Sequence, residues 1–414
     1  MATPINAAAV GALADEPLDW RFKGLPAAWS GRTPAEVCAE SPHLFAGGGG
    51  GAVGPVCVLH ADALAHNLAT MAHWCVDRGV ELAPHGKTHM SPQLLGRQFD
   101  AGACAVTAAT VSQVRVFRAF GVRDVLLANE LVDDAALRWL AAELDADPDF
   151  TMVCWADSVR GVELMTSALT AAGAVRPVDV CVEVGMAGGR TGCRGGEELD
   201  EVARAVAASP RLRLVGVAGY EAALGADLSP DAVAVVRSYL ADVRAAVLRL
   251  TPIVETDRVI ATAGGSTYFD VVADALTEWP ADVSVRTILR SGCYLTHDDG
   301  LYHRTSPLRA ALRPALRVWA QVVSRPEPDL ALLTMGRRDV SFDQDLPVPY
   351  GLPAARVVKL NDQHAYLRLG SDHVEVGDWV EFGISHPCTV FDKWPMIPVL
   401  DEQGLVVDLI RTFF

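Results

Sequence analysis

The sequence lacks several features that would direct it to a membrane, a secretory route or nucleic acid. No uninterrupted apolar stretch reaches the roughly 20 residues that span a bilayer. The first residues show no basic segment followed by an apolar core, so no signal peptide is expected. Basic residues are also scarce, because 35 Lys and Arg stand against 51 Asp and Glu and give a formal net charge of −16. Such acidity repels nucleic acid and anionic lipid, so we expect a small-molecule ligand and neither of these partners.

The nine cysteines show no pairing pattern. Their number is odd, and no Cys-x-x-Cys spacing occurs in the 414 residues. Several lie inside apolar runs, such as Cys154 and Cys181. Such cysteines are typical of reduced core residues, so the cytoplasm is the expected location.

The sequence does contain a repeated alternation of short apolar runs with helical stretches. The predicted strands occupy residues 81–87, 105–110, 124–130, 150–157, 178–185, 212–221, 258–266 and 285–294. Helical patterns are predicted at about 61–78, 112–120, 133–144, 195–208 and 230–250. Eight strands alternating with helices over roughly 210 residues predict an α/β fold, a (β/α)8 TIM-type barrel. A doubly wound sheet is the alternative, but it needs no eighth strand, and no Gly-x-Gly-x-x-Gly motif follows the first strand.

The sequence pattern changes after about residue 305. Short alternating runs at 316–323, 364–369 and 379–382 are separated by glycine, proline and aspartate. We therefore predict a C-terminal antiparallel β domain over residues 301–414, after a barrel over 55–300. Residues 1–54 are predicted to pack with the β domain, and the glycine run at 47–51 is predicted to be a loop.

Lys87 follows the first predicted barrel strand, in the segment Pro-His-Gly-Lys-Thr-His at residues 84–89. Active sites of such barrels lie at the C-terminal ends of the strands. Among apolar neighbours at a barrel mouth, desolvation lowers the pKa of a lysine and makes its amine a nucleophile that can form a Schiff base. His85 and Lys87 are therefore candidate cofactor contacts. A solvated loop lysine is the alternative.

The loops after the seventh and eighth predicted strands are rich in glycine and hydroxyl groups. In these barrels the same two loops hold phosphate groups, because glycine lets backbone N–H groups approach the anion. The candidate contacts are Gly265, Ser266, Thr267, Gly292, Cys293 and Tyr294. Tight turns between strand and helix would have a similar composition. Combined with a lysine after the first strand, the pattern predicts a pyridoxal phosphate site.

Two further strand ends carry candidate site residues. Arg190 follows the fifth predicted strand and would offer a fixed cation to the cofactor ring or to a substrate carboxylate. Tyr220 follows the sixth and would offer a ring that packs on the pyridine, next to the carboxylate of Glu221. The alternative is that Tyr220 lines the barrel and Glu221 begins a helix.

The C-terminal segment Gly-Ile-Ser-His-Pro-Cys at 383–388 contains a candidate metal site. Imidazole and thiolate are preferred zinc ligands, and His386 and Cys388 are two residues apart. Two ligands cannot complete a structural site, but a catalytic metal keeps positions open for water or substrate. The alternative is a structural histidine near a buried cysteine.

These motifs together resemble the D-serine dehydratase and D-threonine aldolase group of fold-type III pyridoxal phosphate enzymes. The resemblance lies in the lysine segment at 84–89, the Gly-Gly-Ser-Thr loop at 264–267 and the His-x-Cys motif at 386–388. The segments at 336–343 and 386–394 resemble the bacterial branch often called amino-acid deaminase. The resemblance covers about residues 20–414 and implies an alanine-racemase-like barrel, a β domain and a homodimer.

The resemblance also implies the roles of the candidate residues. Lys87 would be the Schiff-base lysine and the base that removes the α-proton. His386 and Cys388 would hold a zinc ion close to the cofactor, where it stabilises the leaving β-hydroxyl as a Lewis acid. The pyridinium ring takes up the carbanion electrons, and elimination from D-serine or D-threonine gives a 2-oxo acid and ammonia.

Three alternatives remain open at this point. A D-threonine aldolase would give glycine and an aldehyde. For that branch the resemblance implies an aspartate as the second metal ligand, two residues after the histidine, where this chain has Cys388. An amino-acid racemase would share Lys87 but needs a second base and has no use for His386 and Cys388. A non-catalytic cofactor carrier resembles the isolated barrel, and the long C-terminal region argues against it.

Overall fold

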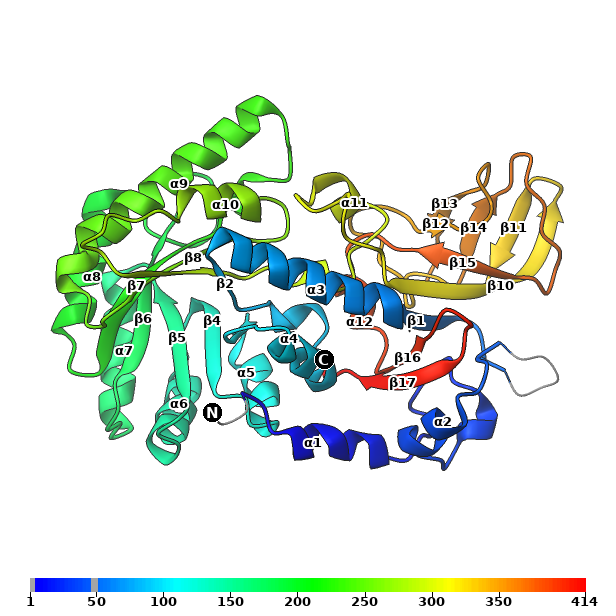
Figure 1. Cartoon of the computed structure of the whole chain (residues 1–414), viewed down its shortest axis with the longest axis horizontal. Coiled ribbons are helices and arrows are strands. Elements are labelled where there is room, and N and C mark those ends of the chain that lie inside the picture. The colour runs from blue at the N-terminus through cyan, green and yellow to red at the C-terminus, as the bar shows by residue number, and fades with distance from the viewer. Residues whose placement is uncertain (1–3, 46–50) are drawn as a thin grey trace. The chain divides into compact units, whose positions relative to one another are not determined.

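Eight strands form one parallel sheet, as the alternation of strand and helix patterns predicts (Figure 1). The structure is a computed structural model that describes residues 4–45 and 51–414. The strands are β2 (Glu81–Leu82), β3 (Val106–Ala108), β4 (Asp124–Glu130), β5 (Thr151–Ala156), β6 (Val178–Val184), β7 (Leu212–Gly219), β8 (Val259–Ala263) and β9 (Val285–Leu289). Their order is β2-β9-β8-β7-β6-β5-β4-β3, and a parallel bridge between His85 and Thr107 joins the ends of this order. The predicted barrel is confirmed.

Helices follow the strands and cover the outer face of the sheet (Figure 1). They are α5 (Val111–Ala119), α6 (Asp134–Ala146), α7 (Val159–Ala171), α8 (Gly196–Ala208), α9 (Pro230–Leu250) and α10 (Phe269–Ala275). The side chains of Thr110, Asp133, Ser158 and Ser229 accept backbone N–H groups at the starts of α5, α6, α7 and α9. These caps fix where each helix begins.

The inside of the barrel is filled by one side chain or two from every strand or its flank. This inner cluster comprises Ala83, Ala105, Leu126, Val153, Trp155, Cys181, Val215, Ala218, Ile260 and Ile288. Successive residues of a strand point to opposite faces of the sheet. Residues two or four positions after a member of the inner cluster therefore also point inward, closer to the C-terminal rim of the barrel. Polar side chains that follow these positions therefore enter the rim of the barrel.

The described chain divides into two compact units that alternate along the sequence. The barrel unit contains residues 4–5, 72–87 and 98–292, and the second unit contains 6–45, 51–71, 88–97 and 293–414. This division differs from boundaries at 54 and 300, because β1 (Val56–His60) pairs with strands of the second sheet. Of the predicted glycine loop at 47–51, only Gly51 lies among the described residues.

The second unit contains a nine-stranded sheet that is antiparallel except for the pair β1 and β16. Besides β1, its strands are β10 (Leu316–Glu327), β11 (Leu330–Leu333), β12 (Val348–Pro349), β13 (Arg356–Leu360), β14 (Ala365–Arg368), β15 (Trp379–Gly383), β16 (Met396–Leu400) and β17 (Val406–Arg411). The predicted C-terminal antiparallel β domain is thereby confirmed. The shorter helices in this unit are α1 (Ala7–Gly11), α2 (Pro34–Glu40), α11 (Leu301–Thr305) and α12 (Cys388–Phe391).

The boundary between the two units along the sequence falls inside two of the helices. They are α3 (Ala61–Arg78), which has the predicted bounds, and α4 (Pro92–Asp100). The N-terminal segment contributes Leu18, Phe22 and Trp29 to a buried cluster with side chains of β1, β16 and β17. In the described ranges we find no helix with the length and apolarity needed to cross a bilayer.

Gly216 in β7 offers a test of the barrel packing. A Cβ atom at this position would lie 2.0 Å from the backbone oxygen of Ile260 in the neighbouring β8. We expect Gly216→Ala to destabilise the barrel unit by at least about 2 kcal/mol and to lower Tm by about 5–10 °C. Differential scanning calorimetry measures the change.

Gly96 in α4 is the matched control, because nothing lies within 4 Å of a Cβ atom added there. Gly96→Ala should leave Tm unchanged or raise it slightly, since alanine is the better helix former. Equal Tm values for Gly216→Ala and the wild type would contradict the close approach of β7 and β8.

Candidate functional site

Lys87 lies at the C-terminal end of β2, in a single-turn 3₁₀ helix over Gly86–Thr88. Glycine is required at position 86, because a Cβ atom there would lie 2.4 Å from the ring of Phe117. The Lys87 side chain is exposed, whereas the sequence pattern predicted apolar surroundings. The tight turn explains the difference, since the residues on either side are buried and the amine remains accessible.

His85 combines burial with an unsatisfied nitrogen. Its Nδ1 is buried and has no hydrogen-bond partner among the residues that the structure describes. Burial holds the pKa of His85 well below its usual value, and the positive charges of Lys87 and Arg290 lower that pKa further. A neutral imidazole is therefore available to a polar ligand at the rim of the barrel.

Arg190 lies in the loop that follows β6 and faces Tyr220 at the end of β7. Its guanidinium carbon is 4.8 Å from the ring centroid of Tyr220, so the structure brings these two predicted residues together. The loop is wrapped around Arg194, whose guanidinium donates to four backbone carbonyls of residues 189–192. Arg194 therefore fixes the loop that carries Arg190.

Tyr239 of α9 links the ends of β6 and β7. Its phenol accepts the backbone N–H of Tyr220 at 2.9 Å and donates to the backbone oxygen of Val184 at 2.7 Å. Burial raises the pKa of Tyr239, so the phenol keeps the proton that it donates. These two hydrogen bonds fix the backbone of Tyr220 relative to the end of β6.

The loop after β8 contains the predicted phosphate contacts. The N–H of Gly265 donates to Glu221, at 2.8 Å from Oε1, so this N–H already has an anionic partner within the protein. The hydroxyls of Ser266 and Thr267 have no hydrogen-bond partner within the described residues. Gly292, which follows β9, is the last residue of the barrel unit. The hydroxyls of Ser266 and Thr267 are therefore free to donate to a ligand at this rim.

Arg290 is a buried cation at the end of β9. Its guanidinium donates to the hydroxyl of Thr262 and the backbone oxygen of Gly219, each at 2.7 Å, and lies 5.6 Å from the ring centroid of Trp155. Burial lowers the pKa of Arg290, while the negative charge of Glu221 opposes this shift. The rim thus contains a fixed positive charge that the sequence motifs did not identify.

Two acidic side chains approach each other near the ends of β4 and β6. Both carboxyl oxygens of Glu130 and one of Glu183 are buried without a hydrogen-bond partner in the described chain. Burial raises the pKa of Glu130 to about 8, and the negative charge of Glu183 contributes to this shift. Glu130 is therefore mostly protonated at neutral pH in the folded protein.

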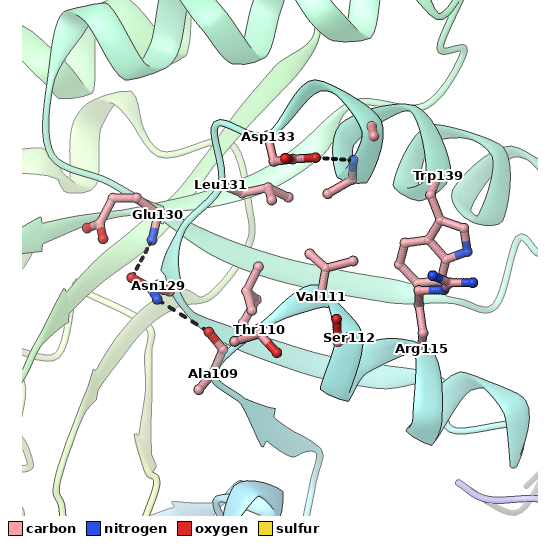
Figure 2. Close-up of a pocket in the computed structure, with 13 residues that line it drawn as sticks. Ala109, Thr110, Val111, Ser112, Arg115, Asn129, Glu130, Leu131, Asp133 and Trp139 are labelled. Carbon is pink, nitrogen blue, oxygen red and sulfur yellow. Dashed lines mark hydrogen bonds between the residues drawn. The ribbon is translucent and has the colours of Figure 1, made fainter. Parts of the chain in front are cut away.

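A pocket of about 570 Å³ lies between the β3–α5 and β4–α6 segments (Figure 2). Figure 2 shows that the carboxyl group of Glu130 turns away from Trp139. Asp133 at its edge accepts the N–H of Ala136 and so caps α6. None of the predicted cofactor contacts lines this pocket.

His386 in the second unit is held by two aspartates. Its φ of 64° is unusual for a side-chain-bearing residue, and its N–H donates to Asp298 at 2.8 Å. Its Nδ1 lies 2.5 Å from Oδ2 of Asp343, which also accepts the hydroxyl of Thr389 through Oδ1. A protonated Nδ1 bonded to a carboxylate leaves Nε2 free to bind a metal.

Cys388 is the second predicted metal ligand and lies in the same unit. Its Sγ is 3.5 Å from Sγ of Cys293 and 3.4 Å from the hydroxyl oxygen of Thr88. The sequence grouped Cys293 and Tyr294 with the phosphate contacts, but both belong to the second unit. The hydrogen bond with Cys388, together with burial, keeps the pKa of Cys293 well above its usual value.

The donor set fits a catalytic metal better than a structural one. Within residues 4–45 and 51–414, no three His, Cys, Asp or Glu side chains converge closely enough to hold an ion. An imidazole nitrogen supported by a carboxylate and the thiol two residues further along the chain are nevertheless suitable types of zinc donor, and two ligands leave positions open for others.

Several residues of these two regions escaped the sequence motifs. Arg290 and Tyr239 act through contacts with segments distant along the chain, whereas Arg194 binds the carbonyls of its own loop. Asp343 carried a weak signal, because it ends the segment at 336–343 that resembles the bacterial deaminase branch. Its partnership with His386, 43 residues away, requires the fold.

Two family models match the chain. The alanine racemase N-terminal domain matches residues 59–286, which is more than half of the chain. A serine dehydratase domain matches residues 315–400.

Characterised proteins are similar to the chain over different lengths. D-threonine aldolase from Arthrobacter sp is 27% identical over 365 residues, which cover 86% of this chain and 90% of that protein. The crystal structure of D-threonine aldolase from Filomicrobium marinum, 27% identical, has a TM-score of 0.76 and covers 87% of this chain and 94% of that one. D-threo-3-hydroxyaspartate dehydratase from Delftia sp. HT23 is 35% identical over 74 residues, or 18% of this chain and 20% of that protein.

The buried acid pair predicts a pH-dependent stability. The unfolded state loses the Glu130 proton near pH 4.5, whereas the folded state keeps it up to about pH 8. Stability therefore decreases as the pH rises between these values, because ionisation favours the unfolded chain. In Glu130→Gln this component is absent, so Tm of the variant minus Tm of the wild type should grow from pH 5 to pH 8.

Glu163→Gln is the control for this measurement, since Glu163 is an exposed partner of Arg160 on α7. Its Tm difference from the wild type should stay flat over the same range. Parallel curves for Glu130→Gln and the wild type would show that Glu130 ionises normally in the folded protein.

Proposed function

This chain belongs to the alanine racemase N-terminal domain family of fold-type III pyridoxal phosphate enzymes. From that premise we propose that the protein is a lyase acting on a D-amino acid with a β-hydroxyl group. Within the family it falls in the D-serine dehydratase and D-threonine aldolase group. The proposed reaction is dehydration, in which loss of the β-hydroxyl leads to a 2-oxo acid and ammonia.

The observation that carries the proposal is the isolation of Lys87. The chain contains only four lysines, and the other three, Lys23, Lys359 and Lys393, belong to the second unit. Lys23 and Lys393 pair with carboxylates there, and Lys359 faces the ring of Tyr366. Among the described residues of the barrel unit, Lys87 is therefore the only lysine.

The barrel rim fits the cofactor on observations independent of family likeness. The amine of Lys87 is accessible, Nδ1 of His85 is buried without a partner, and the hydroxyls of Ser266 and Thr267 are free to donate. When bound, pyridoxal phosphate supplies an electron sink for the negative charge that develops at the α-carbon. In the proposal, Ser266 and Thr267 donate to the phosphate.

The chain's own residues then perform the proton chemistry and the positioning. Lys87 Nζ would hold the cofactor aldehyde and take the α-proton of the substrate. Arg194 and Tyr239 keep Arg190 and Tyr220 in place without contacting the reactants themselves. Such fixed groups contribute to catalysis because they do not have to reorganise during the reaction.

A metal ion is the second component of the proposal. His386 would bind it through Nε2 and Cys388 through Sγ, and the carboxylate of Asp343 would accept the Nδ1 proton of His386. When bound, zinc supplies a Lewis acid that assists departure of a hydroxyl group.

A D-threonine aldolase-type cleavage is the second candidate. It is favoured by the sequence of the aldolase relative, which matches over 86% of the chain, whereas the sequence of the dehydratase relative matches over 18%. Cys388 favours dehydration, because the second metal ligand that the resemblance implies for the aldolase branch at this position is an aspartate. The products distinguish the two reactions.

Product analysis with D-serine and D-threonine tests the reaction. We expect a 2-oxo acid and ammonia from the wild type, and a loss of at least about 1,000-fold in kcat for Lys87→Ala, because no other lysine of the barrel can replace it. Lys359→Ala, in β13, is the matched control and should retain full activity. Glycine and acetaldehyde from D-threonine would assign the aldolase reaction instead.

Metal dependence tests the role of Asp343. We expect a chelator to abolish activity and zinc to restore it, and Asp343→Asn to weaken zinc affinity about 10–100-fold, because the amide no longer accepts the His386 proton as a carboxylate does. Metal titration followed by calorimetry measures this affinity. Asp362→Asn, on an exposed side chain, should leave it unchanged. Full activity of the metal-stripped protein would contradict the metal component.

A further inference from the structure

Glu221 is a fully buried carboxylate without a role in the chemistry described above. It begins the short 3₁₀ helix Glu221–Leu224 after β7, and none of its surface is exposed. Its Oε2 accepts the N–H of Gly264 at 2.9 Å, and its Oε1 accepts the N–H of Gly265 at 2.8 Å. Each carboxyl oxygen thus binds one of two successive backbone N–H groups of the loop after β8.

The conformation of Gly264 makes this arrangement possible. Its φ is +95°, and a Cβ atom at this position would lie 2.6 Å from a side-chain carbon of Leu289. Successive N–H groups around a residue of positive φ converge on one side and form a concave anion site. In this protein the anion in that site is the carboxylate of Glu221.

The carbonyl groups of the same two glycines are fixed from β9. The N–H of Arg290 donates to the oxygen of Gly264 at 3.0 Å, and the hydroxyl of Ser291 donates to the oxygen of Gly265 at 2.5 Å. All four polar backbone groups of Gly264 and Gly265 therefore have partners. The ends of β7 and β9 hold the loop of β8 between them.

Ser266 and Thr267 follow directly after this fixed pair of glycines. Thr267 is almost fully buried, yet neither hydroxyl has a partner in the described chain. Two free hydroxyl donors at the end of a rigid turn form a preorganised binding site for an anion that is not part of the protein. The buried guanidinium of Arg290 supplies positive charge that balances Glu221.

We propose that Glu221 is the positioning residue of the phosphate site: it occupies the N–H groups of Gly264 and Gly265 and thereby presents Ser266 and Thr267 to the phosphate of the cofactor. This role depends on the proposed function, since it presupposes that the barrel binds pyridoxal phosphate. Glu221 determines the preference for a phosphorylated cofactor without contacting it.

The test compares two ligands that differ only in the phosphate. The full chain is stripped of cofactor with hydroxylamine, and pyridoxal phosphate or pyridoxal is titrated in by absorption. In Glu221→Gln one carboxyl oxygen becomes an NH2 group that cannot accept, so one loop N–H loses its partner. We expect Kd for pyridoxal phosphate to rise about tenfold or more, while Kd for pyridoxal changes less than about twofold.

Two further variants complete the experiment. Ser291→Ala releases the carbonyl of Gly265 and should reduce the same preference, which keeps the proposal testable if Glu221→Gln does not fold. Glu255→Gln is the matched control, because Glu255 accepts the N–H of Leu214 on β7, away from the loop. It should leave both Kd values unchanged.

The outcomes separate this role from the function on which it depends. Equal weakening of both ligands in Glu221→Gln would make Glu221 a general structural residue and overturn the positioning role alone. Unchanged binding of both ligands would do the same. A wild type that binds neither pyridoxal phosphate nor pyridoxal would overturn the proposed function together with this role.

Discussion

Closure of the parallel sheet is the constraint on which the candidate site depends. The bridge between His85 and Thr107 joins the first strand of the barrel to the second and leaves no free edge in it. Because all eight strands run in the same direction, every loop from a strand to the next helix leaves from one rim. Lys87 and the loop at 264–267 are about 180 residues apart in sequence and still lie at the same end of the barrel.

The rim contains buried charged side chains, and two of them, Arg290 and Glu221, are satisfied by hydroxyl and backbone groups. The interior changes from apolar side chains to Arg290, Glu183 and Glu221 within a few residues of the strand ends. Burying such groups is unfavourable unless hydrogen bonds and opposite charges compensate them. Arg290 has the hydroxyl of Thr262 and a backbone oxygen, whereas Glu221 has two glycine N–H groups. Perturbed ionisable groups in such places are typical of functional sites.

Much of the fold could be predicted because it depends on local patterns. The helix at 61–78 has the predicted bounds, and all eight barrel strands lie within or very close to the predicted ranges. The strand Val56–His60 was not predicted, because a short apolar run does not reveal its partners, and β10 and β16 lie more than 250 residues away. Sequence motifs located the loops of the candidate site in the same way. They could not reveal that the N–H of Gly265 is bound by Glu221, or that Cys293 lies beside Cys388, because both contacts form only when distant segments fold together.

The central claim is that Lys87 carries the cofactor, and reduction followed by peptide mapping tests it most directly. Borohydride fixes a pyridoxal phosphate bound to a lysine, and mass spectrometry then identifies the labelled peptide. With only four lysines in the chain, the assignment is unambiguous. We predict a single label on the peptide that contains Lys87. A protein that takes up no label, or one labelled on Lys23, Lys359 or Lys393, would contradict the account.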